Sequence, residues 1–305
     1  MTSKPIGIIL LAFGGADSPE AIEPFMKNLM GGRVPPPPLV EKIKARYTLI
    51  GGKSPLPEIT AKQAQKLEEL LNSEGGNFKT DVGMRYWNPF ISEGLERLLN
   101  QGVTTVVAVS LAPFYSEVST GSYQAELERA AAAVEGKNVN IVMAGSLYNN
   151  PLYIAALAEK VKEGLAEFED PTETPVIFSA HSIPVSYIEK GDPYAEQFRF
   201  AVDRVVESLN LKNWYAAYQS KGGGEGQWLE PTVETVMDEL KAKGHTGVLV
   251  ASIGFVSDHI ETLYDVDIAQ KSHAAEIGLQ FQRAGSLNTS DLFIKALAAV
   301  VKEKL

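Results

Sequence analysis

Val106-Val-Ala-Val-Ser-Leu111 is the stretch that decides the fold, together with its later counterpart Val248-Leu-Val-Ala-Ser-Ile253. Each run follows a glycine by a few residues and is almost continuously apolar, whereas a half-exposed strand would alternate apolar and polar side chains. Such runs are typical of parallel strands buried on both faces. Segments with helical apolar spacing lie between the strands, for example around Ile91, Leu95 and Leu98. The alternation predicts an α/β fold with a doubly wound parallel sheet.

The sequence also repeats itself once. Residues 144–161 align without a gap to residues 284–301, and 10 of the 18 positions are identical. Residues 102–123 match residues 244–264 with one gap. A period of about 140 residues indicates a duplicated domain rather than a solenoid of short repeats.

The chain of 305 residues has room for about two domains. The duplication divides it into two similar Rossmann-like domains, at residues 1–148 and 149–287, each with the element order β-α-β-α-β-α. We expect the two domains to face each other across a cleft. In such folds, ligands bind beyond the carboxyl ends of the strands.

Composition excludes several classes of protein. Hydrophobic residues make up 45% and charged residues 22%, which is typical of a globular chain rather than a disordered one. The net charge of −10 disfavours nucleic-acid binding and allows at most peripheral contact with an anionic membrane. There is no cysteine, which excludes disulfides, Cys-ligated iron–sulfur clusters and thiolate zinc sites.

The start of the chain resembles an export signal only superficially. Lys4 precedes the apolar run Ile6–Phe13, which is too short to span a bilayer. A similar run recurs inside the chain at Val176–Ala180, where an export signal has no role. We therefore interpret the first run as a buried strand and expect a cytoplasmic protein.

The places where the two copies differ are candidates for the functional site, because shared residues mainly maintain the fold. Three positions at the carboxyl ends of strands gain titratable groups in the second copy only. Phe13 is replaced by His181, Val118 by His259 and Thr120 by Glu261. A helix cap or a solvated acid in a first helical turn explains one such change. Three changes at one edge of a sheet favour a site.

Glu261 and Asp265 are four residues apart, so they lie on one face of a predicted helix. With His181 opposite, they offer one imidazole and two carboxylates. This set of groups can bind a divalent metal ion and can accept protons near neutral pH.

These residues lie in segments that resemble a known family. Phe178-Ser-Ala-His-Ser-Ile-Pro184 and Gly254-Phe-Val-Ser-Asp-His-Ile-Glu-Thr-Leu-Tyr-Asp265 look like the two signature segments of ferrochelatases. Residues 50–56, 111–114, 218–220 and 228–231 are similar to further family segments. The resemblance covers essentially the whole chain. It implies Fe²⁺ insertion into a porphyrin in haem biosynthesis, on two chelatase-like Rossmann domains, with the helix at 288–305 packing back on the first.

The resemblance also implies roles for individual residues. His181 takes up pyrrole protons or holds the metal, with Glu261 as its partner. Asp265 extends the acidic line, and His259 orients the site. The family positions that lie along the porphyrin or its acidic groups correspond to Arg46, Tyr47, Ser54 and Tyr123, and Arg85 and Tyr86 are a second candidate contact. Apolar walls for the macrocycle are expected from Phe13, Met26, Met30 and Trp228.

Three departures from the family pattern bear on the substrate. Phe13 stands where enzymes that metallate coproporphyrin III commonly have tyrosine, and Met30 stands where an arginine is often found. Ala269 replaces the third acid of the helical line. The compact loop at residues 31–38, however, looks like the short coproporphyrin-type enzymes. The balance favours coproporphyrin III, with protoporphyrin IX as the alternative.

Two other hypotheses stay open. One is metal insertion into sirohydrochlorin, although relatives with that activity usually place two histidines at the metal. The other is a non-catalytic tetrapyrrole carrier, which would not need titratable groups in one copy only. No cofactor is expected beyond the substrate Fe²⁺, and the expected partners are the porphyrin, Fe²⁺ and an iron donor or upstream haem-pathway enzyme.

Overall fold

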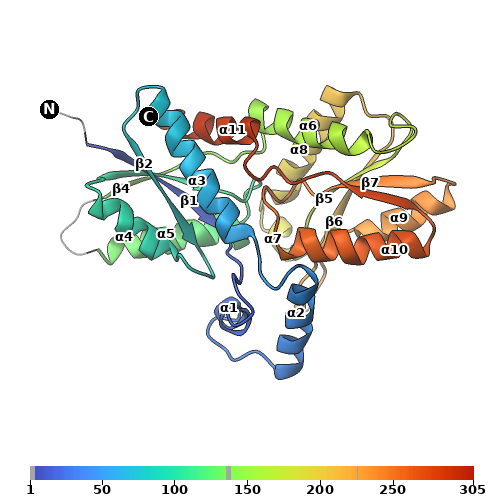
Figure 1. The fold of residues 1–305 in the computed structure, drawn as a ribbon, viewed down its shortest axis with the longest axis horizontal. Coiled ribbons are helices and arrows are strands. Elements are labelled where there is room, and N and C mark those ends of the chain that lie inside the picture. The colour runs from blue at the N-terminus through green and yellow to red at the C-terminus, as the bar shows by residue number, and fades with distance from the viewer. Residues whose placement is uncertain (1–3, 135–138, 225) are drawn as a thin grey trace.

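The computed structural model describes residues 4–134, 139–224 and 226–305. These residues contain two parallel four-stranded sheets with the same internal order (Figure 1). The first has the order β2-β1-β3-β4 and comprises β1 (Ile6–Ala12), β2 (Phe78–Met84), β3 (Thr105–Ser110) and β4 (Asn140–Met143). The second has the order β6-β5-β7-β8 and comprises β5 (Val176–His181), β6 (Trp214–Gln219), β7 (Gly247–Ala251) and β8 (Gln280–Arg283). The predicted duplicated α/β fold is confirmed.

Each sheet has one strand more than the predicted β-α-β-α-β-α order allows. The additional strands, β4 and β8, are four residues long and lie at the edges of the sheets. They are less buried than β1, β3, β5 and β7. β8 has a single apolar residue, and the apolar run of β4 is only three residues long, whereas the central strands are recognised by longer continuous runs.

Helices cover both faces of each sheet. The first half contains α3 (Leu56–Ser73), α4 (Ile91–Asn100), η1 (Glu117–Gly121) and α5 (Ser122–Ala132). The second half contains α7 (Val185–Glu189), α8 (Tyr194–Leu209), α9 (Val233–Ala242), η2 (Glu261–Gln270) and α10 (Lys271–Glu276). A separate extension, α1 (Ile22–Leu29) and α2 (Pro37–Leu49), projects from the body of the molecule in Figure 1.

Two further helices each follow the last strand of one half and pack against the other half. α6 (Pro151–Leu165) follows β4 but packs against α8 and β7 of the second half. α11 (Asp291–Lys302) follows β8 but packs against α3 and β3 of the first half, and the two helices contact each other. One buried apolar cluster therefore runs from the inner face of one sheet to that of the other. This is the packing expected for the final helix, whereas the domain boundaries at residues 148 and 287 stay predictions.

The segments that follow β3 and β7 are π-helices, η1 and η2, rather than the α-helix predicted around Glu261. A π-helix bonds residue i to i+5, is rare and occurs frequently at functional sites. Its signature is a backbone pattern that the spacing of side chains does not reveal. The two halves carry the same irregularity at equivalent places.

The α1–α2 extension has a small core of its own. Ile22, Phe25, Met26 and Tyr47 are buried in it, and Ile260 of the second half packs against it. Met26, which the sequence places among the candidate walls for a ligand, is therefore a core residue of the extension. The extension joins the segment before η2 to the first half of the molecule.

Gly94 allows α4 to approach β2 closely. A Cβ atom at Gly94 would lie 2.3 Å from the carbonyl oxygen of Val82. Overpacking costs about 1–3 kcal/mol, and the gain of about 1 kcal/mol in helix propensity offsets only part of it. We expect Gly94→Ala to lower the midpoint of urea denaturation. Gly145→Ala is the matched control, because nothing lies within 4 Å of its added Cβ; equal midpoints for the two variants would contradict the prediction.

Candidate active site

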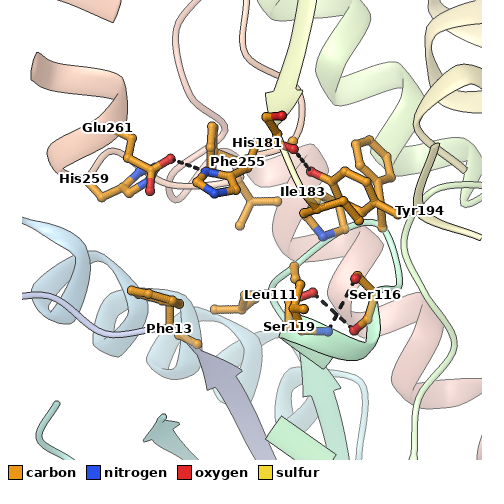
Figure 2. Close-up of a pocket in the computed structure, with 18 of the residues that line it drawn as sticks. Phe13, Leu111, Ser116, Ser119, His181, Ile183, Tyr194, Phe255, His259 and Glu261 are labelled. Carbon is orange, nitrogen blue, oxygen red and sulfur yellow. Dashed lines mark hydrogen bonds and ion pairs between the residues drawn. The ribbon is translucent and has the colours of Figure 1, made fainter. Parts of the chain in front are cut away.

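A cavity of about 430 Å³ lies between the carboxyl ends of the two sheets (Figure 2). Its volume is in the range of small-molecule and cofactor sites. Both sheets contribute the residues that follow their two central strands, β1 and β3 in one half and β5 and β7 in the other. At these points the strand order reverses, which is where open parallel sheets bind ligands.

A histidine–carboxylate pair lines the cavity. His181 is the last residue of β5, and Glu261 is the first residue of η2. His181 Nδ1 lies 2.9 Å from Glu261 Oε2 (Figure 2). Because an ionised carboxylate can only accept, Nδ1 carries the donated proton. In the neutral imidazole, Nε2 then keeps a free lone pair for a proton or a metal ion.

Burial and pairing act on this pair in opposite directions. Burial lowers the pKa of His181, but the charge of Glu261 and its hydrogen bond outweigh this and raise the pKa above the ordinary 6.5. Burial raises the pKa of Glu261, but the charge of His181 and its hydrogen bond outweigh that effect and lower the pKa to about 2. Glu261 is therefore an anion at neutral pH, and it stabilises a proton on His181.

His259 faces the same cavity from the loop before η2. Its Nδ1 lies 3.0 Å from the carbonyl oxygen of Ser257, which can only accept, so Nδ1 donates there. Its ring packs 4.6 Å from the ring of Phe255. The predicted orienting role of His259 stays a prediction, and its imidazole is close enough to contribute to the lowered pKa of Glu261.

Asp265 lies behind the pair and is already partnered. It accepts a hydrogen bond of 2.5 Å from the hydroxyl of Ser220, and its other oxygen lies 3.6 Å from Arg46 Nη1. Burial and the charge of Glu261 raise the pKa of Asp265 against these contacts. Arg46 also stacks on the ring of Tyr264 at 4.8 Å and does not line the cavity. In this structure Arg46 contacts the acidic line, whereas its predicted partner is a porphyrin carboxylate.

Tyr47 and Ser54 are buried and contact backbone groups of the protein. Tyr47 is buried in the α1–α2 extension, and its hydroxyl accepts a long hydrogen bond from the backbone N–H of Ala16. Burial raises the pKa of Tyr47 to about 12, so it stays a neutral phenol. Ser54 is also buried, and its hydroxyl accepts from the N–H of Leu56. Neither residue lines the cavity, and their substrate contacts stay predictions.

Phe13, one of the predicted wall residues, lines the cavity with an exposed side chain. Its side chain is 42% exposed and packs 4.8 Å from the ring of Tyr86. Arg85 lies next to Tyr86 but pairs with Glu126, with Nη1 at 3.6 Å. Tyr86, Arg85 and Met30 lie outside the cavity lining.

Tyr123 and Trp228 do line the cavity. Tyr123 is fully buried in the first half, and burial raises the pKa of its hydroxyl. Trp228 donates its indole N–H to the carbonyl oxygen of Gly224, and its ring lies next to Gly222.

Sequence reasoning missed several residues of the cavity. Tyr194 donates its hydroxyl proton to the carbonyl oxygen of His181 at 2.9 Å, which fixes the end of β5. Ser116, which directly precedes η1, and Ser119 within η1 also line the cavity (Figure 2). The rule that ligands bind beyond strand ends would have found the two serines. Nothing in the local sequence marks Tyr194.

The cavity carries no positive side chain in the described part of the chain: none of the residues that line it is lysine or arginine. No group of three histidine, aspartate or glutamate side chains there is arranged to hold a metal ion. A metal ion in the cavity would therefore meet the His181–Glu261 pair without a complete protein cage. No helix among the described residues is long and apolar enough to cross a membrane.

Comparisons with known proteins show what the chain is similar to. The family model described as Ferrochelatase matches residues 5–305. Ferrochelatase of Geotalea uraniireducens is 42% identical, with 96% of each chain covered. Ferrochelatase of Aquifex aeolicus is 40% identical, covering 98% of this chain and 99% of the relative.

Among solved structures, SirB of Bacillus subtilis with Fe³⁺ aligns with a TM-score of 0.61 at 13% identity, covering 98% of this chain and 95% of that one. CbiX, described as the terminal enzyme of sirohaem biosynthesis in denitrifying bacteria, aligns with a TM-score of 0.57 at 10% identity, covering 98% and 99%. At these identities the likeness concerns the fold alone.

Proposed function

The chain belongs to the ferrochelatase family of lyases, which acts in haem biosynthesis, and on this premise we propose that it inserts Fe²⁺ into protoporphyrin IX in preference to coproporphyrin III. The observation that carries the proposal is the His181–Glu261 pair in an otherwise largely apolar cavity without a lysine or arginine in its described lining. The sirohydrochlorin and carrier hypotheses have no observation of their own in their favour.

Metallation exchanges two pyrrole protons for one Fe²⁺. His181 Nε2 is the free nitrogen that accepts the two pyrrole protons one after the other and releases each to solvent, to which its side chain is 35% exposed, and the anionic Glu261 stabilises the imidazolium that forms each time. While its Nε2 is still unprotonated, His181 is together with Glu261 the ligand pair nearest to an arriving Fe²⁺. Because they offer the metal fewer donors than the four porphyrin nitrogens, transfer from the pair to the macrocycle is favourable.

The charge of the cavity supports the dicarboxylic porphyrin. Coproporphyrin III has four propionates and protoporphyrin IX has two. Arg46 and Arg85, the cations predicted to meet these groups, pair with Asp265 and Glu126 instead. Each additional carboxylate near Glu261 would be repelled without a compensating cation. The short loop at residues 31–38 favours coproporphyrin III in the sequence, but it supplies no cation to the described lining of the cavity.

The experiment is anaerobic Fe²⁺ insertion with the two porphyrins, alone and in competition, followed by absorbance. We expect a higher kcat/KM for protoporphyrin IX. A higher value for coproporphyrin III would overturn the preference and leave the activity standing. Turnover of neither porphyrin would overturn the proposed function itself.

The pH dependence follows from the shifted pKa values. His181 accepts a proton only when neutral, and its pKa is raised above 6.5 by Glu261 against the effect of burial. We therefore expect kcat/KM to increase with pH through a midpoint above 6.5. An anaerobic pH–rate profile measures this midpoint. A midpoint at or below 6.5 would mean that Glu261 does not hold a proton on His181.

We further propose that Fe²⁺ is a substrate and that no resident cofactor takes part, which the absence of cysteine supports for iron–sulfur clusters. A cytoplasmic location is supported by the apolar run near the start of the chain, which forms the buried central strand β1. An iron donor or an upstream haem-pathway enzyme is the proposed protein partner. Iron and sulfide analysis of the purified protein tests for a resident cluster. Cell fractionation tests the location, and cross-linking tests the protein partners.

A further inference from the structure

One arginine outside the cavity holds the segment that carries His259 and Glu261 at two points. Arg283 is the last residue of β8 and is largely buried, with a side chain 13% exposed. Its guanidinium forms a two-pronged ion pair with Asp267, with Nε at 2.7 Å and Nη2 at 3.0 Å. Its Nη1 donates to Asp258 at 3.1 Å. Asp258 directly precedes His259, and Asp267 lies within η2, so the two acids flank Glu261 in the sequence.

Asp258 receives further hydrogen bonds that tie it to the segment after β8. The hydroxyl of Ser286 donates to it at 2.7 Å, and the side-chain amide of Asn288 donates at 2.8 Å. The backbone N–H of Asp258 in turn donates to the Asn288 side chain at 2.9 Å. The loop before η2 is therefore bound on both its backbone and its side chain.

The network continues to the other half of the molecule. Gln63 of α3 is fully buried, and its side-chain nitrogen donates to the hydroxyl of Ser257 at 2.8 Å and to the carbonyl oxygen of Asn288 at 2.7 Å. Ser257 lines the cavity beside His259. The segment before η2 is therefore held by α3 of the first half as well as by β8 of the second half.

We propose that Arg283 is a positioning residue, which holds Asp258 and Asp267 together and thereby fixes Glu261 against His181. The proposal rests on the proposed function. A planar guanidinium can serve two carboxylates in fixed directions, whereas a lysine ammonium offers a single point charge. Displacing a metal-site or catalytic group through its supporting partners typically costs about 10- to 100-fold in activity.

The test compares Arg283→Met, Arg283→Lys and Asp267→Asn in the full-length protein. We expect kcat for Fe²⁺ insertion to fall about 10- to 100-fold in the methionine and asparagine variants, with the KM for porphyrin unchanged and the lysine variant intermediate. Hydrogen–deuterium exchange should increase in residues 257–270. Arg283→Lys and Asp267→Asn keep the test decisive if Arg283→Met does not fold.

The matched control is Arg97→Met, because Arg97 makes a comparable two-pronged ion pair with Asp81, and neither residue lines the cavity. It should leave kcat and the exchange of residues 257–270 unchanged. Arg283→Met and Asp267→Asn alter the local charge in opposite directions. If they shift the pH–rate midpoint in opposite directions and keep the maximal kcat, Arg283 acts through its charge and the proposal is overturned.

Unchanged exchange in residues 257–270 of the Arg283 variants would overturn it as well. If the wild-type protein inserts no iron, the proposed function fails. The exchange measurement then still decides whether Arg283 holds the segment.

Discussion

His181→Ala is expected to abolish most of the Fe²⁺ insertion while the porphyrin still binds. The substitution removes the only described side chain in the cavity that pairs with Glu261 and offers a free basic nitrogen. Losing a positioned proton acceptor typically costs about 10²- to 10⁴-fold in rate, and here the same change also removes a proposed metal ligand. We therefore expect kcat to fall by about 10⁴-fold, the upper end of that range. Porphyrin binding, followed by fluorescence quenching, should change little because the apolar walls remain.

The chain provides a matched control for this substitution. His273 Nε2 lies 2.9 Å from Asp238 Oδ1, which is the same kind of pair outside the cavity. His273→Ala should keep the wild-type kcat. If His181→Ala retained more than about a tenth of the wild-type kcat, the proton acceptor would have to be sought elsewhere in the cavity. If it lost porphyrin binding and turnover together, its role would be in binding rather than in chemistry.

Much of the architecture is predictable from sequence because it depends on burial. The runs around Val106 and Val248 are buried on both faces, and this requires continuous apolar residues. The repeat at 144–161 and 284–301 becomes α6 and α11, and its high identity reflects two helices that pack on each other and on opposite halves. The pairing of His181 with Glu261 was also predictable, because His181 ends one central strand and Glu261 follows the neighbouring central strand of the same sheet.

Other features depend on long-range partners and leave no local signal. Arg46 looks like a helix-surface arginine in the sequence, yet its pairing with Asp265 depends on how α2 meets η2. Arg283 looks like an ordinary residue at the end of an edge strand, and only the fold shows that Asp258 and Asp267 converge on it. The π-helices belong to the same group, since a change in backbone hydrogen bonding leaves the amino-acid pattern unaltered.

Glu261→Gln is expected to separate the charge of this side chain from its shape. Glutamine can still accept the Nδ1 proton of His181, but it carries no charge to stabilise an imidazolium or to attract Fe²⁺. We expect kcat near pH 7.5 to fall by about 10²-fold or more, since electrostatic stabilisation of this kind is worth about 10²- to 10³-fold. The pKa of His181 should fall, because the charge of Glu261 is what raises it against the effect of burial. The residual activity should then have an acidic midpoint at lower pH than the wild type.

Glu261→Gln is also expected to change how the free energy of unfolding depends on pH. Burial raises the pKa of Glu261, but the charge and hydrogen bond of His181 outweigh this and lower it from 4.5 to about 2. The contribution of Glu261 to the free energy of unfolding is therefore present above pH 4.5 and is lost as the pH falls towards 2. The raised pKa of His181 makes its contribution complete below 6.5 and lost as the pH rises through the folded value. The wild type should therefore exceed Glu261→Gln in free energy of unfolding most between pH 4.5 and 6.5, and the difference should shrink on either side. Urea titrations across that range measure it, with Asp238→Asn as the control at the exposed pair. A difference that stays constant with pH would mean that the two groups are not electrostatically linked.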